Sequence, residues 1–260
     1  MKDFLVGVSY VPRGFSELLR PGYRRYVLIP LLINTLVFIG LFWLSAHEFR
    51  HLLDWLTPAV ASRPGTGWLH GLLEATVAIV RWLLWPLFLL VAVVVMFYSF
   101  TLVANIVASP FNSMLAARVE RRLSRGRFPP SLPGGLLKDT LVSIKTEVKK
   151  LGYFVLLAIP CLVVSLIPGL NVFAPFVWAA YGAWAVALEY LDYPMANHGM
   201  HFAEERKKAR SRTLLALGFG GAILAVSVIP LLNLLAMPCA VVAATLLWHE
   251  QLKPPDAHDL

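Results

Sequence analysis

The chain has 260 residues, a formal net charge of +8 and a mean hydropathy of +0.68, with 58% hydrophobic and only 15% charged residues. One soluble core cannot bury that much apolar surface, so lipid must cover a large part of it. The composition excludes a soluble domain and predicts an all-α integral membrane protein. Because the basic residues flank the apolar runs, we do not expect nucleic acid as a partner.

Four uncharged runs of 21, 36, 38 and 36 residues follow a mixed segment at 1–25; they cover residues 26–46, 82–117, 151–188 and 213–248. The segment at 1–25 is predicted to lie at the membrane interface. About 20 helical residues cross the hydrocarbon core, so the first run is predicted to be the first transmembrane helix. The second run is longer than one upright span and is predicted to be one long transmembrane helix that bends near Pro110.

The third and fourth runs repeat each other at their centres. Six of eight residues are shared at an offset of 62, in VSLIPGLN at 164–171 and VSVIPLLN at 226–233. Proline removes a backbone donor and asparagine needs polar partners, so each run is predicted to turn there. The resulting limbs of about 15 to 17 residues reach only about 22 to 26 Å. We therefore predict two re-entrant helical hairpins, 151–188 and 213–248, with four full crossings as the alternative.

The basic residues predict the orientation of the chain. Of 23 lysines and arginines, five precede the first run, nine lie in 118–150 and five in 206–212, whereas only three lie in 47–81. Excess positive charge marks the cytoplasmic side. The termini, including the tail at 249–260, the segment at 118–150 and the connector at 189–212 are thus expected in the cytoplasm, and the loop at 47–81 in the periplasm.

A candidate anion site directly precedes the first transmembrane helix, at Arg20-Pro21-Gly22-Tyr23-Arg24-Arg25. Proline suits the first helical position, so the following amides would be the unpaired donors of a helix N-terminus. Such amides, together with guanidinium groups, favour an oxyanion. The predicted binding residues are Gly22, Tyr23, Arg24 and Arg25. The alternative is that these arginines only enforce the orientation of the chain.

Polar side chains within the apolar regions are a second group of candidates. Those that could line a hydrated path are Asn34, Asn105, Ser109, Asn112, Asn171 and Asn233. Hydrogen bonding between packed helices is the alternative for each. Glu120 could form an ion-pair gate with Arg118, Arg121 or Arg122 at the end of the second span, or these residues could form a solvated face.

Metal and cofactor chemistry receive little support from the sequence. Cys161 and Cys239 lie in different apolar runs and are expected to be buried thiols. Asp192, His198 and His201 have the residue types of a metal site, but we expect no metal there. No phosphate-binding loop or Ser-His-Asp arrangement is present, so we expect no cofactor and no enzymatic activity.

Several motifs in one order resemble the CysZ family of bacterial sulfate permeases, and the resemblance runs from about residue 4 to residue 250. They are PGYRRYVLIPLLIN at 21–34, ASPFN at 108–112 with LA at 115–116 and VE at 119–120, DYP at 192–194 with NH at 197–198, and the two repeated turns. The resemblance implies sulfate uptake across the inner membrane for cysteine biosynthesis. It also implies an all-helical subunit with two long spanning helices and two partly penetrating hairpins that assembles as an oligomer.

The same resemblance implies a sulfate site at the family's Gly-Leu-Arg motif. This motif maps onto Gly22, Tyr23 and Arg24, with Arg25 following and tyrosine in place of leucine. Selectivity among sulfate, sulfite and thiosulfate stays open. We expect a homo-oligomer in lipid, with small residues such as Gly218 and Gly220 allowing hairpins to approach between subunits.

Two other classes of function remain as alternatives. One is a membrane scaffold that binds a partner through the basic segments at 118–150 or 206–212 and moves no solute. The other is an intramembrane enzyme, which is the weaker alternative because the chain offers no nucleophile-base pair or metal cluster.

Overall fold

A computed structural model describes residues 1–56, 68–124 and 136–253, and these residues are almost entirely helical and include no strand. Five helical segments are long and apolar enough to cross a membrane: Arg25–His51, Glu74–Val95, Val148–Leu166, Asn171–Asn197 and Leu235–Leu252. A sixth candidate is the pair Phe202–Ser211 and Thr213–Ser227, bent by 102°. The predicted all-α membrane protein is therefore confirmed.

The chain divides into two compact units, one of residues 1–27 with 110–260 and one of residues 28–109. The second unit is built from helix α2 (Arg25–Leu56) and the greater part of helix α4 (Trp68–Leu123). The ring of Phe49 stacks on Phe88 with centroids 4.0 Å apart and meets Trp85 edge-on at 5.0 Å. Aromatic contacts of this kind hold the two helices together.

Both long helices extend further than their apolar runs predicted. The described residues of the expected loop at 47–81 are helical, because α2 continues to Leu56 and α4 begins at Trp68. Residues 57–67 lie outside the described residues. The reason for the extension on the α2 side is visible in the apolar spacing: Phe49 and Leu53 lie four residues apart on one helical face and are both buried. Buried apolar side chains therefore continue beyond the uncharged run.

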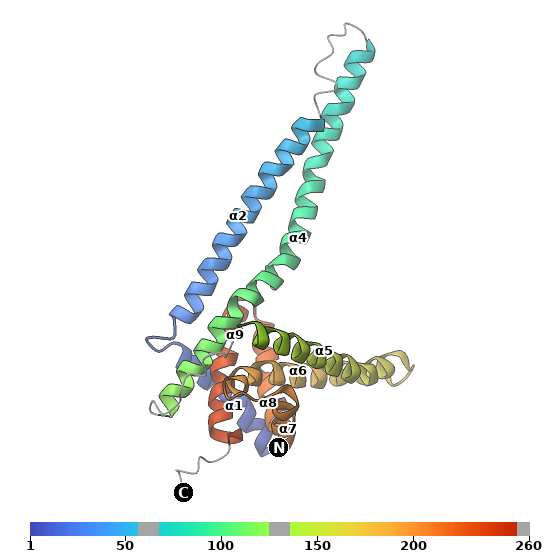
Figure 1. Cartoon of the computed structure of the whole chain (residues 1–260). Coiled ribbons are helices and arrows are strands. Elements are labelled where there is room, and N and C mark those ends of the chain that lie inside the picture. Colours follow the sequence, from blue (N-terminus) through green and yellow to red (C-terminus); the bar gives the residue numbers. More distant parts are fainter. Residues whose placement is uncertain (57–67, 125–135, 254–260) are drawn as a thin grey trace. The chain divides into compact units, whose positions relative to one another are not determined.

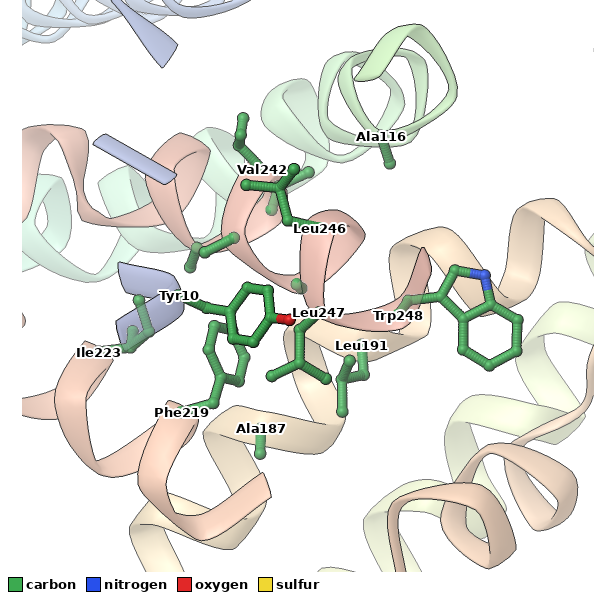
Figure 2. Close-up of a cluster of buried hydrophobic side chains, with 14 of the residues drawn as sticks. Tyr10, Ala116, Ala187, Leu191, Phe219, Ile223, Val242, Leu246, Leu247 and Trp248 are labelled. Carbon is green, nitrogen blue, oxygen red and sulfur yellow. The ribbon is translucent and has the colours of Figure 1, made fainter. Parts of the chain in front are cut away.

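The core of the first unit surrounds the N-terminal helix α1 (Lys2–Leu18), which packs on helices α8 (Thr213–Ser227) and α9 (Pro230–Leu247). Figure 2 shows the side chains of Tyr10, Phe219 and Leu247 gathered in this core. All three are essentially inaccessible to solvent. Helix α6 (Ala174–Asn197) completes the cluster with Leu191. The segment predicted to lie at the interface thus forms a helix that contributes directly to the core of this unit.

Glycines allow these helices to approach closely. A Cβ atom added at Gly14 would lie 2.7 Å from the Cβ of Ala243, and one at Gly218 would collide with the Phe4 carbonyl. A Cβ at Gly220 would meet the Ala183 carbonyl of α6 in the same way. Gly218 and Gly220 therefore mediate contacts within the subunit. Our expectation that they serve contacts between subunits is corrected, because their faces are already occupied by α1 and α6.

The repeated turns occur where the sequence predicts them. Helix α5 (Leu136–Leu166) is followed by a short 3₁₀ helix η1 (Asn171–Phe173) and then by α6, and α8 is followed directly by α9. In Figure 1, α5 and α6 run side by side as one hairpin. Helix α7 (Phe202–Ser211) connects the hairpins, and a π-helical turn η2 (Trp248–Leu252) follows α9.

Candidate anion-binding site

The segment between α1 and α2 forms a turn rather than the first turn of a helix. Gly22 has φ +99°, a conformation that glycine adopts without steric cost, and α2 begins only at Arg25. The Tyr23 amide donates to the Arg20 carbonyl at 3.4 Å and the Tyr26 amide to the Tyr23 carbonyl at 3.0 Å. The prediction that Pro21 opens the helix is therefore corrected: the left-handed Gly22 delays its start.

The turn still leaves backbone donors available. Among the described residues, the amides of Gly22, Arg24 and Arg25 donate to no backbone carbonyl. Only the Tyr23 amide of the four predicted donors is already engaged. An oxyanion beside this turn could therefore accept hydrogen bonds from main-chain amides as well as from arginines.

A cavity of about 410 Å³ opens beside the turn, and it is lined by Arg20, Pro21, Gly22, Tyr23, Arg118, Arg121 and Arg122. One liquid water occupies about 30 Å³, so the space would hold a tetrahedral oxyanion together with several waters. Arg118, Arg121 and Arg122 share one face of α4, because positions three and four apart are neighbours on a helix. The cavity therefore joins the predicted anion segment to the arginines that the sequence suggested as a gate.

The positive charge of the cavity is only partly neutralised. Glu17 Oε2 lies 3.0 Å from Arg20 Nε, and Glu17 Oε1 contacts Arg122. Within the part of the chain that the structure describes, Arg118 and Arg121 are paired with no carboxylate. Four guanidinium groups thus face one carboxylate, which leaves an excess of positive charge and two free donor forks for an oxyanion.

Tyr23 provides the apolar floor and a neutral hydroxyl group. Its side chain is only 4% exposed. Burial raises the pKa of its hydroxyl above the ordinary value, although the guanidinium groups of Arg118 and Arg20 oppose this shift. The hydroxyl therefore stays protonated at neutral pH and adds no negative charge that would repel an anion.

Arg24 and Arg25 occupy different surroundings from those expected. Arg24 Nη2 donates to the Leu19 carbonyl at 3.3 Å. The Arg25 guanidinium lies 5.0 Å from the centre of the Tyr26 ring and donates to the Tyr26 hydroxyl at 3.2 Å. Neither side chain lines the cavity. The side-chain donors come instead from Arg20 and from α4, more than 90 residues later in the sequence.

Glu120 is paired with a histidine rather than with an arginine. It is completely buried, its Oε1 atom lies 2.5 Å from His198 Nε2, and its Oε2 atom has no hydrogen-bond partner among the described residues. Successive helical residues point about 100° apart, so a residue between Arg118 and Arg121 faces another side of α4. The arrangement connects α4 to the end of α6 and does not form the ion-pair gate with Arg118, Arg121 or Arg122 that we considered.

The candidate path residues are distributed over several places. Buried Asn112 donates to the Tyr193 hydroxyl at 3.4 Å, which is the helix-to-helix hydrogen bond of the alternative interpretation. Asn34 is 8% exposed and its Oδ1 atom has no partner within the described residues. Ser109 is exposed on α4, Asn171 and Asn233 are exposed at or just after the hairpin turns, and the side chain of Asn105 lies outside the described residues.

One ion cluster escaped the sequence analysis. Lys150, near the middle of α5, is 5% exposed, and its Nζ atom lies 2.9 Å from both Glu189 Oε2 and Asp192 Oδ2 on α6. These ion pairs join the two limbs of one hairpin. Among the described residues, no three His, Cys, Asp or Glu side chains gather in a metal-binding group.

Known proteins resemble this chain over nearly its whole length. The family model described as sulfate transporter CysZ/etoposide-induced protein 2.4 matches residues 10–238. Sulfate transporter CysZ of Pseudomonas aeruginosa (strain PAO1) is 39% identical over 246 residues, covering 94% of each chain. Sulfate transporter CysZ of Pectobacterium atrosepticum is 35% identical over 248 residues, covering 95% of this chain and 86% of its own length.

Proposed function

Because the chain belongs to the sulfate transporter CysZ/etoposide-induced protein 2.4 family, we propose that it is a permease that moves sulfate across the membrane. The observation that most directly supports a site for this activity is the cavity beside Gly22. There, Arg118 and Arg121 have no carboxylate partner among the described residues and face an open backbone amide. A dianion that leaves water needs several fixed donors of this kind.

The cavity also meets the second need of a permease, which is release of the ion. Conduction requires binding that is favourable enough for entry yet weak enough for exit. The space is larger than the bare anion, so waters can share its coordination. Glu17 already holds Arg20 and Arg122, and its negative charge lowers the affinity for a dianion. Sulfate is therefore captured at the cavity without being held irreversibly.

The oligomeric state, the membrane, the orientation and the further substrates that we propose are those expected from the sequence. The protein works as a homo-oligomer in the bacterial inner membrane with both termini in the cytoplasm, and it supplies sulfate for cysteine biosynthesis. Sulfite and thiosulfate are also sulfur oxyanions whose oxygen atoms accept hydrogen bonds, so we include them as further substrates. Asn34 and Asn112 remain candidates for lining a hydrated path. No cofactor and no catalytic step are needed for this function.

Labelled-sulfate flux into liposomes tests the proposal and locates the site. We would compare the wild type with two variants that each lose two positive charges, Arg118→Gln/Arg121→Gln and Arg24→Gln/Arg25→Gln. The first pair lines the cavity, and the second does not. Loss of charge-assisted hydrogen bonds should weaken sulfate binding, and so lower the flux at low sulfate concentration, by about tenfold or more in the first variant only.

The possible outcomes separate the site from the function. If the Arg24→Gln/Arg25→Gln variant loses flux and the other keeps it, the permease remains and the anion is bound at the turn by those arginines. If the folded wild type shows no flux above empty vesicles, the permease is refuted and a membrane scaffold becomes the better explanation. Circular dichroism of each variant checks that the helices are intact.

A further inference from the structure

The first unit has a second hollow, which lies among helices of the two hairpins. It has a volume of about 620 Å³ and is formed by α5, α6 and α8. Its walls are mostly apolar and include Leu157, Pro160 and Cys161 of α5, Val177 and Ala180 of α6, and Leu217 of α8. None of the residues assigned to the anion cavity lines this hollow. We refer to it as the hairpin groove, because helices of the two hairpins form it.

One end of the hairpin groove is cationic. Arg210 lines the groove, and its guanidinium carbon lies 6.0 Å from the centre of the Tyr153 ring. The guanidinium of Arg206 lies 4.9 Å from the same ring. The two arginines are four residues apart, so they share one face of α7. Within the described residues, neither is paired with a carboxylate.

The aromatic residue between the arginines and the groove is held in place. Tyr153 accepts a hydrogen bond from Trp184 Nε1 at 2.9 Å, and its ring meets Phe202 edge-on with centroids 5.6 Å apart. Stacking of guanidinium groups on a fixed ring restricts their motion while leaving their N–H donors free. Helix α7 is bent by 102° from α8. The arginines thus sit where the chain turns away from an apolar helix.

The shape and charge together define the chemistry of an occupant. Transfer of sulfate into a groove with apolar walls is unfavourable, because a desolvated dianion needs hydrogen-bond donors on all sides. A helix with its side chains is about 10–12 Å wide. A hydrocarbon chain is narrower, and each buried methylene contributes about 0.8 kcal/mol. An amphiphile with an anionic head group suits both parts of the site.

We propose that the hairpin groove binds an acyl chain of an anionic phospholipid whose phosphate is held by Arg206 and Arg210. Arginine forks match phosphate oxygens in pairs, and basic pockets between membrane helices bind lipid head groups in this way. The bound lipid contacts α5, α6, α7 and α8 at once. It therefore links the first hairpin to the base of the second and stabilises the hairpins together.

Native mass spectrometry of the full-length protein in detergent tests this site, with phosphatidylglycerol and phosphatidylcholine added at equal concentrations. The wild type should retain phosphatidylglycerol at least about tenfold better, and Arg206→Gln/Arg210→Gln should lose this preference. The matched control is Lys207→Gln/Lys208→Gln, which removes the same charge from the same helix. It should keep the preference, since the cations that lie over the Tyr153 ring at the end of the groove are Arg206 and Arg210 and not these lysines.

The apolar part is tested separately by Ala180→Trp, which fills the groove from its exposed edge, with Ala180→Leu as a milder variant. Both should reduce retention of phosphatidylglycerol while leaving sulfate flux unchanged. If Lys207→Gln/Lys208→Gln loses the preference for phosphatidylglycerol to the same extent, the specific site is refuted, because general surface charge would then explain the preference. Displacement of the lipid by inorganic phosphate would refute the role of the acyl chain.

A second copy of the chain is the remaining occupant that the experiment can reveal. Light scattering reports the oligomer size of the same samples. If Ala180→Trp breaks the oligomer and the wild type retains no phosphatidylglycerol, the groove is a contact between subunits and the lipid proposal is wrong. Quenching of tryptophan fluorescence by phosphatidylglycerol with brominated chains, reduced in Trp184→Phe, would support the lipid at the groove floor.

Discussion

The two hairpins carry the same turn motif but differ in what surrounds them. In the first hairpin, 11% of the residues in the apolar window of α5 and 22% of those in the window of α6 are buried within the protein. In the second, 72% of the residues in the window of α9 are buried. The repeated motif therefore specifies a break in the helix, whereas the burial of the limbs is decided by other residues.

Those other residues are small ones that allow α1 to pack closely against the limbs of the second hairpin. Gly14 meets Ala243 on α9, and Gly218 meets the Phe4 backbone on the other limb. In the first hairpin, Gly152 has no atom within 4 Å of an added Cβ, and neighbouring Val155 and Leu156 are exposed. The first hairpin thus offers its apolar side chains to lipid, and the second offers a groove to a helix of its own chain.

The largest effect that separates the hairpins is expected from enlarging a glycine in each. Gly220→Leu should destabilise the protein by about 3 kcal/mol or prevent folding, because the side chain would collide with the α6 backbone. Gly152→Leu should change the free energy of unfolding by less than about 1 kcal/mol. Unfolding in detergent with increasing denaturant gives both values. Equal destabilisation by the two variants would contradict the difference in packing.

A smaller effect is expected from the ion cluster at the base of the first hairpin. Lys150→Ala removes the partner of Glu189 and Asp192 and should cost about 2 kcal/mol. This is less than for a wholly buried cluster, because the side chains of the two carboxylates are 54% and 29% exposed and can be hydrated. The exposed neighbour Lys149→Ala is the control and should have little effect. A similar loss in both would argue against the cluster.

Two substitutions of the glycine in the first turn should differ in their effect on the free energy of unfolding by about 1 kcal/mol. Gly169 has φ +88°, so Gly169→Leu places a side chain in a conformation that costs about 1–2 kcal/mol. Gly169→Asn is the matched control and should be milder, since asparagine adopts this region more readily. Thermal unfolding in one detergent compares the two. If leucine is tolerated as well as asparagine, the first turn can adopt the geometry of the second, where Leu231 occupies the equivalent position.

The smallest effect concerns the tie between α1 and the base of the second hairpin. Arg212 Nη2 lies 2.8 Å from Asp3 Oδ1, and the hydrogen bonds of Arg212 lower the pKa of this exposed carboxyl. A lowered pKa contributes stability that is fully present above the unfolded value near 4 and is lost as the pH falls through the lower folded value. Asp3→Asn should therefore lower the melting temperature slightly at pH 7, and this difference should shrink as the pH falls below about 4. A difference that persists at low pH would exclude this ion pair as its cause.

Apolar runs and the repeat predicted the long apolar helices and both turns, since these depend on local composition. Which residues form the anion cavity was harder to predict from the sequence. Arg118 and Arg121 were visible as a basic cluster, but only folding places them opposite Gly22. The partner of Glu120 was hidden for the same reason, because His198 is 78 residues away along the chain. Contacts across such distances have no signal in a single sequence.

The position of α1 also has a consequence for the making of the protein. Its contacts are with helices at the far end of the chain, and Asp3 is separated from Arg212 by 209 residues. At roughly 5–20 residues per second, a ribosome takes about 10–40 s to synthesise that length. Throughout this time the face of α1 that carries Gly14 has no final partner. The helix must remain without its final contacts until α8 and α9 have been made, so a segment synthesised early reaches its place in the fold late.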